Sequence, residues 1–308
     1  MPVPLYYDPS QVGTLYSPDV GRAINEGDNS GLSPSSSDSR KVALILVDAQ
    51  VDFVHVDGSL SVPGAVDDTR RTIEWLYQNV GQVTQIFASL DTHVLKQIFY
   101  PTWWVNQAGD HPQPFTAISA EQVRQGIWSP TTEMDWSVEY VQMLEERGKK
   151  TLIIWPYHTI LGTAGHAITP ALYEAIAYHS SARDIDPIFL SKGSIPKTEH
   201  YSILEPEVKV PDEPLGTINK ALIERLREFE LIYVAGQAKS HCVLETISSL
   251  HRNTESTDPE FIRKWRFLKD CTSSVVHPEI DFDAIANARL AEFAALGMGM
   301  VTSKEPIS

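Results

Sequence analysis

Short runs of consecutive apolar residues recur along the chain, separated by stretches in which apolar residues repeat every three or four positions. The first run, KVALILVD at 41–48, is wholly apolar from Val42 to Val47, which is typical of a strand buried on both faces of a sheet. Comparable runs, each of which predicts a strand, lie at 83–91, 150–156, 186–193, 230–236 and 265–270, with a shorter one at 298–303.

The stretches between these runs predict amphipathic helices. Their apolar residues follow the helical repeat at 65–80, 134–148, 218–230, 242–253 and 281–297. Strands that alternate with helices imply right-handed crossovers and a mostly parallel sheet. We therefore predict an α/β domain with helices on both faces of its sheet.

Two segments depart from this alternation. Residues 1–40 are rich in Ser, Pro, Gly and Asp, and we expect an N-terminal extension that wraps on the surface or contacts a partner subunit. The domain then occupies 41–308, with an insertion at about 96–134. This insertion carries three of the seven tryptophans, so we expect an ordered loop near the functional end of the sheet.

Composition narrows the class of protein. The 308 residues include 40 acidic and 25 basic ones, a formal charge of −15, which argues against nucleic-acid binding because phosphate neutralisation needs a surplus of Lys and Arg. No apolar run approaches the ~18 residues of a membrane span, and the N-terminus does not resemble a secretion signal. We expect a cytoplasmic protein in which both cysteines, Cys242 and Cys271, are thiols.

Chemically capable residues follow the predicted strands. In an open parallel sheet, ligands bind beyond the carboxyl ends of the strands. The residues that follow successive strands are Asp48, Asp91 with His93, His158, Lys192, and Cys242. We expect these side chains to gather at one edge of the sheet.

Cys242 is the candidate nucleophile. It follows the strand at 230–236 and opens a predicted helix, where backbone N–H groups would favour a thiolate and could hold an oxyanion. With it, Asp48 would accept and later return a proton, and Lys192 would supply positive charge. Cys271 fits a buried structural thiol better, and we interpret His241, beside the nucleophile, as having no catalytic role.

Asp91, His93 and His158 have the residue types of a metal site for zinc, iron or manganese, zinc first. For a fourth ligand, the nearest candidate is His111, Glu121 is another, and water is the alternative. The remaining histidines, which we interpret as surface or core residues, are His55, His166, His179, His200, His251 and His277.

Residues 41–303 resemble the nicotinamidase branch of the isochorismatase-like cysteine hydrolases. The motifs that carry the resemblance, in the family's order, are VDAQVDF at 47–53, GSLSVPGA at 58–65, DTH at 91–93, WPYHTILGTAGH at 155–166, SKG at 191–193 and AGQAKSHCV at 235–243. The resemblance implies a three-layer α/β/α sandwich with a central six-stranded, mostly parallel sheet. It also implies a homo-oligomer.

The same resemblance assigns roles to residues. It implies a triad of Asp48, Lys192 and Cys242, and a metal on Asp91, His93 and His158 that meets the ring nitrogen of the substrate. It further implies ring-flanking aromatic residues at Phe53 and Trp155, oxyanion-hole N–H groups at Ala238 and Cys242, and a cis peptide bond between Gln237 and Ala238.

The function implied is hydrolysis of nicotinamide, or a related small amide, to the acid and ammonia through a thioester. The alternatives are another hydrolase of the superfamily, acting on a carbamoyl or ureido amide or on isochorismate, and a catalytically silent binding protein. Three departures bear on the substrate. The sequence AKSHC replaces the usual A-T-D-x-C, Thr159 stands where Cys often follows the metal histidine, and the 96–134 insertion is long.

Overall fold

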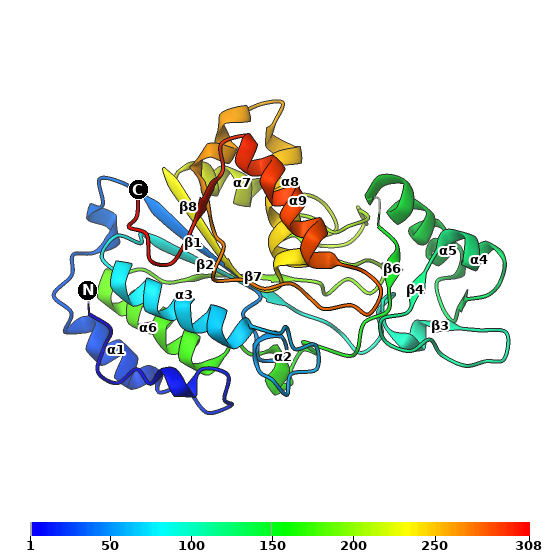
Figure 1. The fold of residues 1–308 in the computed structure, drawn as a ribbon, viewed down its shortest axis with the longest axis horizontal. Helices are drawn as coiled ribbons and strands as arrows, with labels where there is room; N and C mark the ends of the chain where they lie inside the picture. Colours follow the sequence, from blue (N-terminus) through cyan, green and yellow to red (C-terminus); the bar gives the residue numbers. More distant parts are fainter. Residues whose placement is uncertain (1, 149) are drawn as a thin grey trace.

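A six-stranded parallel sheet forms the centre of the molecule (Figure 1), a computed structural model that describes residues 2–148 and 150–308. The strand order is β10-β9-β8-β1-β2-β7, and every neighbouring pair is parallel. The strands are β1 (Val42–Val47), β2 (Gln85–Asp91), β7 (Ile188–Lys192), β8 (Leu231–Gly236), β9 (Trp265–Leu268) and β10 (Gly299–Val301).

Helices cover both faces of this sheet, which confirms the three-layer prediction (Figure 1). Successive residues of a strand point to opposite faces. Accordingly, Leu44 and Leu46 of β1 belong to one apolar core and Ala43 and Ile45 to another. The first core is covered by α3 (Ala65–Asn79) and α6 (Pro170–Arg183), and the second by α7 (Lys220–Arg227), α8 (Leu244–Thr254) and α9 (Phe282–Ala295).

The run at 150–156 is not a strand of the central sheet, so that prediction is wrong. Only Leu152–Ile153 is extended (β6), and it pairs antiparallel with β4 (Ala117–Ile118) in a separate small sheet. Within the central sheet β2 pairs directly with β7, which leaves no position between them. The sixth strand is instead the short C-terminal run, which forms β10.

Helix α6 has no counterpart among the predicted helices. It is buried on most of its circumference, so its sequence lacks the alternation of apolar and polar faces that marks a half-exposed helix. Part of its cover comes from α1 (Val20–Asp28), which lies in the N-terminal segment and packs along it. A side chain at Gly27 would meet the Tyr178 carbonyl at 2.6 Å, so the two helices approach closely there.

The 96–134 segment is ordered and extends away from the sheet (Figure 1, right). It contains a small antiparallel pair and a short capped helix, and a longer helix follows it. These elements are β3 (Trp104–Val105), β4, α4 (Ala120–Arg124), β5 (Ser129–Pro130) and α5 (Met134–Met143). A four-residue helix, α2 (Val51–Val54), follows β1.

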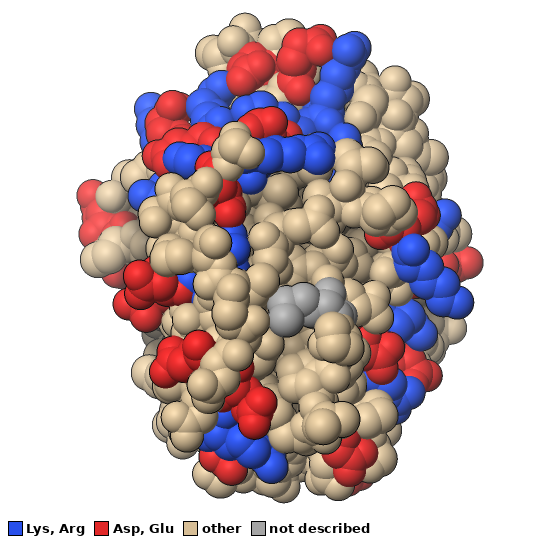
Figure 2. Space-filling view, turned by 90° about the vertical axis from the view of Figure 1, so that its left-hand side faces the viewer, with Lys and Arg blue, Asp and Glu red and all other residues tan. Residues whose placement is uncertain are grey.

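Acidic and basic side chains are interspersed on the face that Figure 2 presents, so the net charge of −15 does not form a single acidic field there. Across residues 2–148 and 150–308, no helix combines the length and apolarity needed to cross a bilayer.

Candidate active site

Lys192 lies at the centre of a group of side chains from four neighbouring strands or the segments that follow them. Its Nζ atom is 2.8 Å from Asp48 Oδ2, 2.8 Å from Asp91 Oδ1 and 3.6 Å from the Sγ atom of Cys242. It also donates to the carbonyl of His200 at 3.0 Å. The carboxyl ends of β1, β2, β7 and β8 therefore bring together the predicted acid, lysine and cysteine.

Burial strongly shifts the pKa values of the ionisable side chains in this group. Lys192 is only 2% exposed. Burial lowers the pKa of its ammonium, but Asp48 and Asp91 outweigh burial and hold that pKa well above its usual range, so the lysine is charged. Burial raises the pKa of the Asp48 carboxyl, which Lys192 opposes. Asp48 is therefore a carboxyl whose affinity for a proton is increased, as a proton acceptor requires.

Cys242 rests as a thiol. Burial raises the pKa of this thiol well above its usual range, and the neighbouring Lys192 lowers it only in part. A helix N-terminus alone would favour the thiolate, but the cysteine lies one turn inside a π-helical segment, Lys239–Val243, that precedes α8. The thiol must therefore lose its proton as it reacts, and the neighbouring carboxyl of Asp48, which also raises the pKa of the thiol, is the candidate acceptor.

The backbone N–H of Ala238 donates no hydrogen bond to another described residue, whereas the N–H groups of Gln237, Lys239 and Val243 all do. Both Ala238 and Cys242 line the pocket described below. The peptide bond between Gln237 and Ala238 is cis, as the resemblance implies. A free N–H group that faces the pocket beside the nucleophile is what an oxyanion hole requires.

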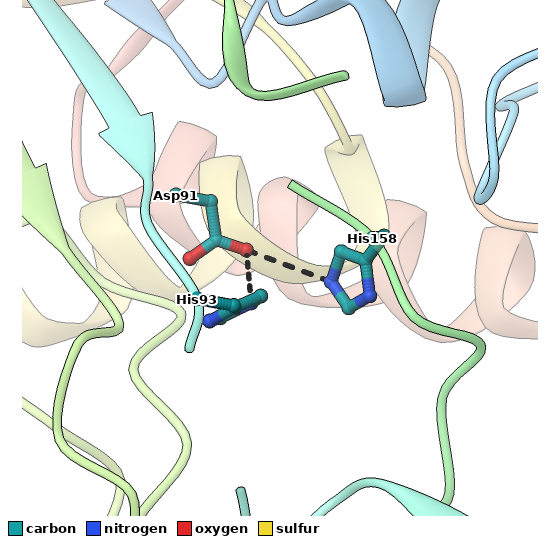
Figure 3. A group of neighbouring side chains, drawn as sticks. All are labelled: Asp91, His93 and His158. Carbon is teal, nitrogen blue, oxygen red and sulfur yellow. Dashed lines mark ion pairs between the residues drawn. The ribbon is translucent and has the colours of Figure 1, made fainter. Parts of the chain in front are cut away.

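Asp91, His93 and His158 form a second group, and all three are buried (Figure 3). Their potential ligand atoms lie within 4.8 Å of one another. The Oδ2 atom of Asp91 is 2.8 Å from His93 Nε2 and 3.7 Å from His158 Nε2. Asp91 also ties this group to the first, because its other oxygen, Oδ1, contacts Lys192.

The hydrogen bonds of the two histidines fit a metal site. The Nδ1 atom of His93 is 3.0 Å from the carbonyl of Gly193, and that of His158 is 2.7 Å from the carbonyl of Pro156. A carbonyl only accepts, so each Nδ1 carries the proton and each Nε2 can present its lone pair. Lone pairs that converge on a carboxylate oxygen need a cation among them, so these residues could hold a divalent metal ion.

The structure does not bring the candidates for a fourth ligand to this group. His111 is exposed, and its Nδ1 atom contacts the carbonyl of Trp104 at 2.7 Å. Glu121 is also exposed and forms an ion pair with Arg124. The described residues thus provide three protein ligands at this site.

The thiol and the metal-binding group line one small pocket. Phe53 and Trp155 line it, as do several residues that the sequence did not single out as functional: Leu60, Phe99, Glu199, His200, Tyr201, His241 and Val275. Neither ring nitrogen of His200 has a hydrogen-bond partner among the described residues.

Glu199 is the acidic member of this wall that sequence reasoning missed. Its Oε1 atom accepts from Trp155 Nε1 at 2.8 Å and from the hydroxyl of Tyr201. Burial raises the pKa of the Glu199 carboxyl to about 7. The sequence gives little indication that Glu199 lines the pocket. This residue follows Lys192 in an irregular loop, where no pattern of apolar residues predicts which side chains face inward.

His241 also belongs to the pocket, although we expected no catalytic role for it. Its ring packs edge-on against Trp155, Tyr201 and Phe282, with ring centres 5.3, 5.3 and 4.7 Å away. Burial lowers the pKa of this imidazole to about 3, so the ring is neutral. It supplies a wall of the pocket beside the thiol.

Comparison with known proteins places the fold. No protein-family model matches this sequence, and no curated protein matches it at the level of sequence. Solved structures do match in fold. A nicotinamidase/pyrazinamidase from Acinetobacter baumannii has a TM-score of 0.55 and 17% identity, over 85% of this chain and 96% of that chain.

The yeast nicotinamidase bound to the inhibitor nicotinaldehyde has a TM-score of 0.56 and 17% identity, over 85% of this chain and 99% of that chain. The PnC1 protein of L. infantum, in complex with nicotinate, has a TM-score of 0.52 and 19% identity, over 86% and 94%. This chain therefore has the same fold as these nicotinamidase structures.

Proposed function

We propose that this protein is a cysteine-dependent amidohydrolase that converts nicotinamide, or a closely related small heteroaromatic amide, into the carboxylic acid and ammonia. One observation carries the proposal: Lys192 lies between Asp48 and Asp91 and 3.6 Å from the sulfur of Cys242, and Cys242 lines an aromatic pocket. The likeness in fold to nicotinamidases supports it.

The first half-reaction forms a thioester. Asp48 takes the proton of the Cys242 thiol as the sulfur forms a bond to the amide carbon, and the carbonyl oxygen gains the negative charge. The proposed donors to that oxygen are the backbone N–H groups of Ala238 and Cys242, two residues that line the pocket. When the tetrahedral intermediate collapses, the C–N bond breaks and Asp48 returns the proton to the leaving nitrogen, which departs as ammonia.

The second half-reaction restores the enzyme. Asp48 takes a proton from a water molecule as the water oxygen bonds to the thioester carbon. The C–S bond then breaks, the sulfur regains its proton, and the carboxylic acid leaves. Lys192 stays charged throughout, so it stabilises the anionic sulfur and orients Asp48 without exchanging protons.

Asp91, His93 and His158 would hold a divalent metal, with zinc proposed first. When bound, the ion would supply a Lewis acid for the ring nitrogen of the substrate. Phe53 and Trp155 would face the flat ring, since aromatic rings favour offset or edge contacts with one another. The ring of Phe53 already packs edge-on against His158, with centres 5.5 Å apart.

The pocket disfavours isochorismate among the alternatives. That substrate carries two carboxylates, whereas none of the residues found to line the pocket is Lys or Arg. The nearby Lys192 is already paired with two carboxylates. A neutral amide needs no cationic side chain in the pocket.

A panel assay tests the function. Purified protein is given nicotinamide, pyrazinamide, an N-carbamoyl amide or isochorismate, and ammonia or product release is measured. We expect turnover of the pyridine or pyrazine carboxamide and none of isochorismate, with Cys242→Ala as the inactive control. Turnover of isochorismate alone, or no turnover with unreactive Cys242, would reject the proposal. Cytoplasmic location and homo-oligomer formation stay predictions.

A further inference from the structure

The side chain of Gln50 is wholly buried between the ends of β1 and β2. Its Oε1 atom accepts from the backbone N–H of Asp91 at 2.7 Å, and its Nε2 atom donates to the backbone carbonyl of Asp91 at 2.9 Å. The second Nε2 hydrogen goes to the carbonyl of His166 at 2.8 Å. One amide thus satisfies both backbone groups of a proposed metal ligand.

These bonds replace a missing piece of sheet. The backbone pairing of β1 with β2 ends at Leu46 and Ala88, three residues before Asp91. On its other side, Asp91 is paired with Lys192 of β7. Gln50 therefore serves as the strand partner that β1 no longer provides, and it fixes the backbone from which the Asp91 carboxylate projects.

Asp52 likewise fixes the backbone next to His158, another member of the metal-binding group. Its Oδ2 atom accepts from the backbone N–H of Thr159 at 2.7 Å, and its Oδ1 atom accepts from Ser59 N at 3.1 Å. Thr159 follows His158 and has a φ of +46°, in the left-handed region that a β-branched residue rarely adopts. The hydrogen bond that Thr159 N donates to Asp52 holds that conformation, and with it the orientation of the adjacent His158.

We propose that Gln50 is a positioning residue for the metal group and that Asp52 supports it, so that residues 50–52 hold the Asp91 and His158 halves at a fixed separation. The inference rests on the proposed function, since it assigns the residues that preorganise its metal site. Ligands held in place before binding lose less freedom when the ion arrives, and loss of such supporting bonds typically weakens metal affinity 10–100-fold.

The test uses Gln50→Leu, which removes all three hydrogen bonds at similar volume, and Gln85→Leu as the matched control. Gln85 is also a buried glutamine bonded to backbone carbonyls, those of Ile86 and Asp186, but it lies at the opposite end of β2. The dissociation constant for Zn²⁺ is measured by competition with a chromophoric chelator on folded full-length protein. We expect a 10–100-fold weaker constant for Gln50→Leu and less than a threefold change for Gln85→Leu.

Gln50→Glu provides a second variant if the leucine variant does not fold. It keeps the acceptor for Asp91 N–H but places an oxygen against two carbonyls, so we expect weaker Zn²⁺ binding there as well. Equal affinity in wild type and the Gln50 variants would overturn the inference while leaving the proposed function intact, as would an equal loss in Gln85→Leu. A wild-type protein that takes up no Zn²⁺ would overturn both the inference and the metal assignment.

Discussion

Lys192 and Asp91 form a buried ion pair, with Nζ and Oδ1 2.8 Å apart. This pair joins the side chains around Cys242 to the metal-binding group. The other Asp91 oxygen faces His93 and His158, so one carboxylate serves both groups. The two parts of the proposed chemistry are therefore held at a fixed distance by a single residue at the end of β2. Substitutions should separate their contributions.

The two cysteines should differ sharply. Cys242→Ala should lower the amidase turnover number at least ~10³-fold, because no thioester can form, while the protein stays folded. The matched control is Cys271→Ala, at a buried thiol that lies outside the pocket, which should keep its activity and lose ~1 kcal/mol of stability. Ammonia release and urea unfolding measure the two effects, and full activity in Cys242→Ala would reject the mechanism.

Lys192→Met should destabilise the fold as well as abolish activity. Removing the ammonium leaves the buried carboxyls of Asp48 and Asp91 without their shared cation, and an uncompensated buried charge typically costs about 3–5 kcal/mol. Adding Asp48→Asn should recover part of that loss, since it removes one of the two acids. Urea unfolding of the single and double variants checks this, and a single-variant loss below about 1 kcal/mol would contradict it.

Stability should fall as the pH rises through the titration of Glu199. The pKa of Glu199 in the folded protein is raised to about 7 from its ordinary value of 4.5, so between those two pH values the folded state binds more protons than the unfolded state. The stabilisation is complete below pH 4.5 and is lost by about pH 7. Glu207, whose pKa is also raised to about 7, should contribute in the same direction.

Glu199→Gln should remove part of this dependence, because a neutral amide keeps the acceptor for Trp155 without titrating. The free energy of unfolding is measured by urea titration at intervals from pH 4.5 to 8. We expect the variant to lose less stability over this range than wild type, by up to ~3 kcal/mol. Glu121→Gln, at an exposed site, controls for the substitution itself. An unchanged slope in Glu199→Gln would contradict the prediction.

Metal content should depend on His158 and not on His111. His158→Ala removes one of the three clustered ligands, so the purified protein should bind metal at least ~10-fold more weakly than wild type. His111→Ala should retain its metal, since that side chain is exposed and bonded to Trp104. Elemental analysis after dialysis provides the readout. Equal metal loss in both variants, or none in either, would argue against the assignment.

The convergence of Asp48, Asp91, Lys192 and Cys242 was predictable because it follows from topology. Each residue comes at or just after a buried apolar run, and parallel strands place their carboxyl ends at one edge. His158 joins them by a different route. Its preceding run is not in the central sheet, and backbone bonds between His93 and the segment at 159–161 bring it alongside.

The apolar runs and the helical stretches between them were enough to predict a mostly parallel sheet, its two covered faces and the strand ends that carry the site, because burial and the alternation of strands with helices are visible in local patterns. Only the tertiary structure decided what depends on distant neighbours. It buried α6 on nearly all sides, turned Glu199 into the pocket, made Gln50 the partner of Asp91, and raised the pKa of Cys242. These outcomes reflect solvent exclusion and contacts between remote segments, which no local pattern records.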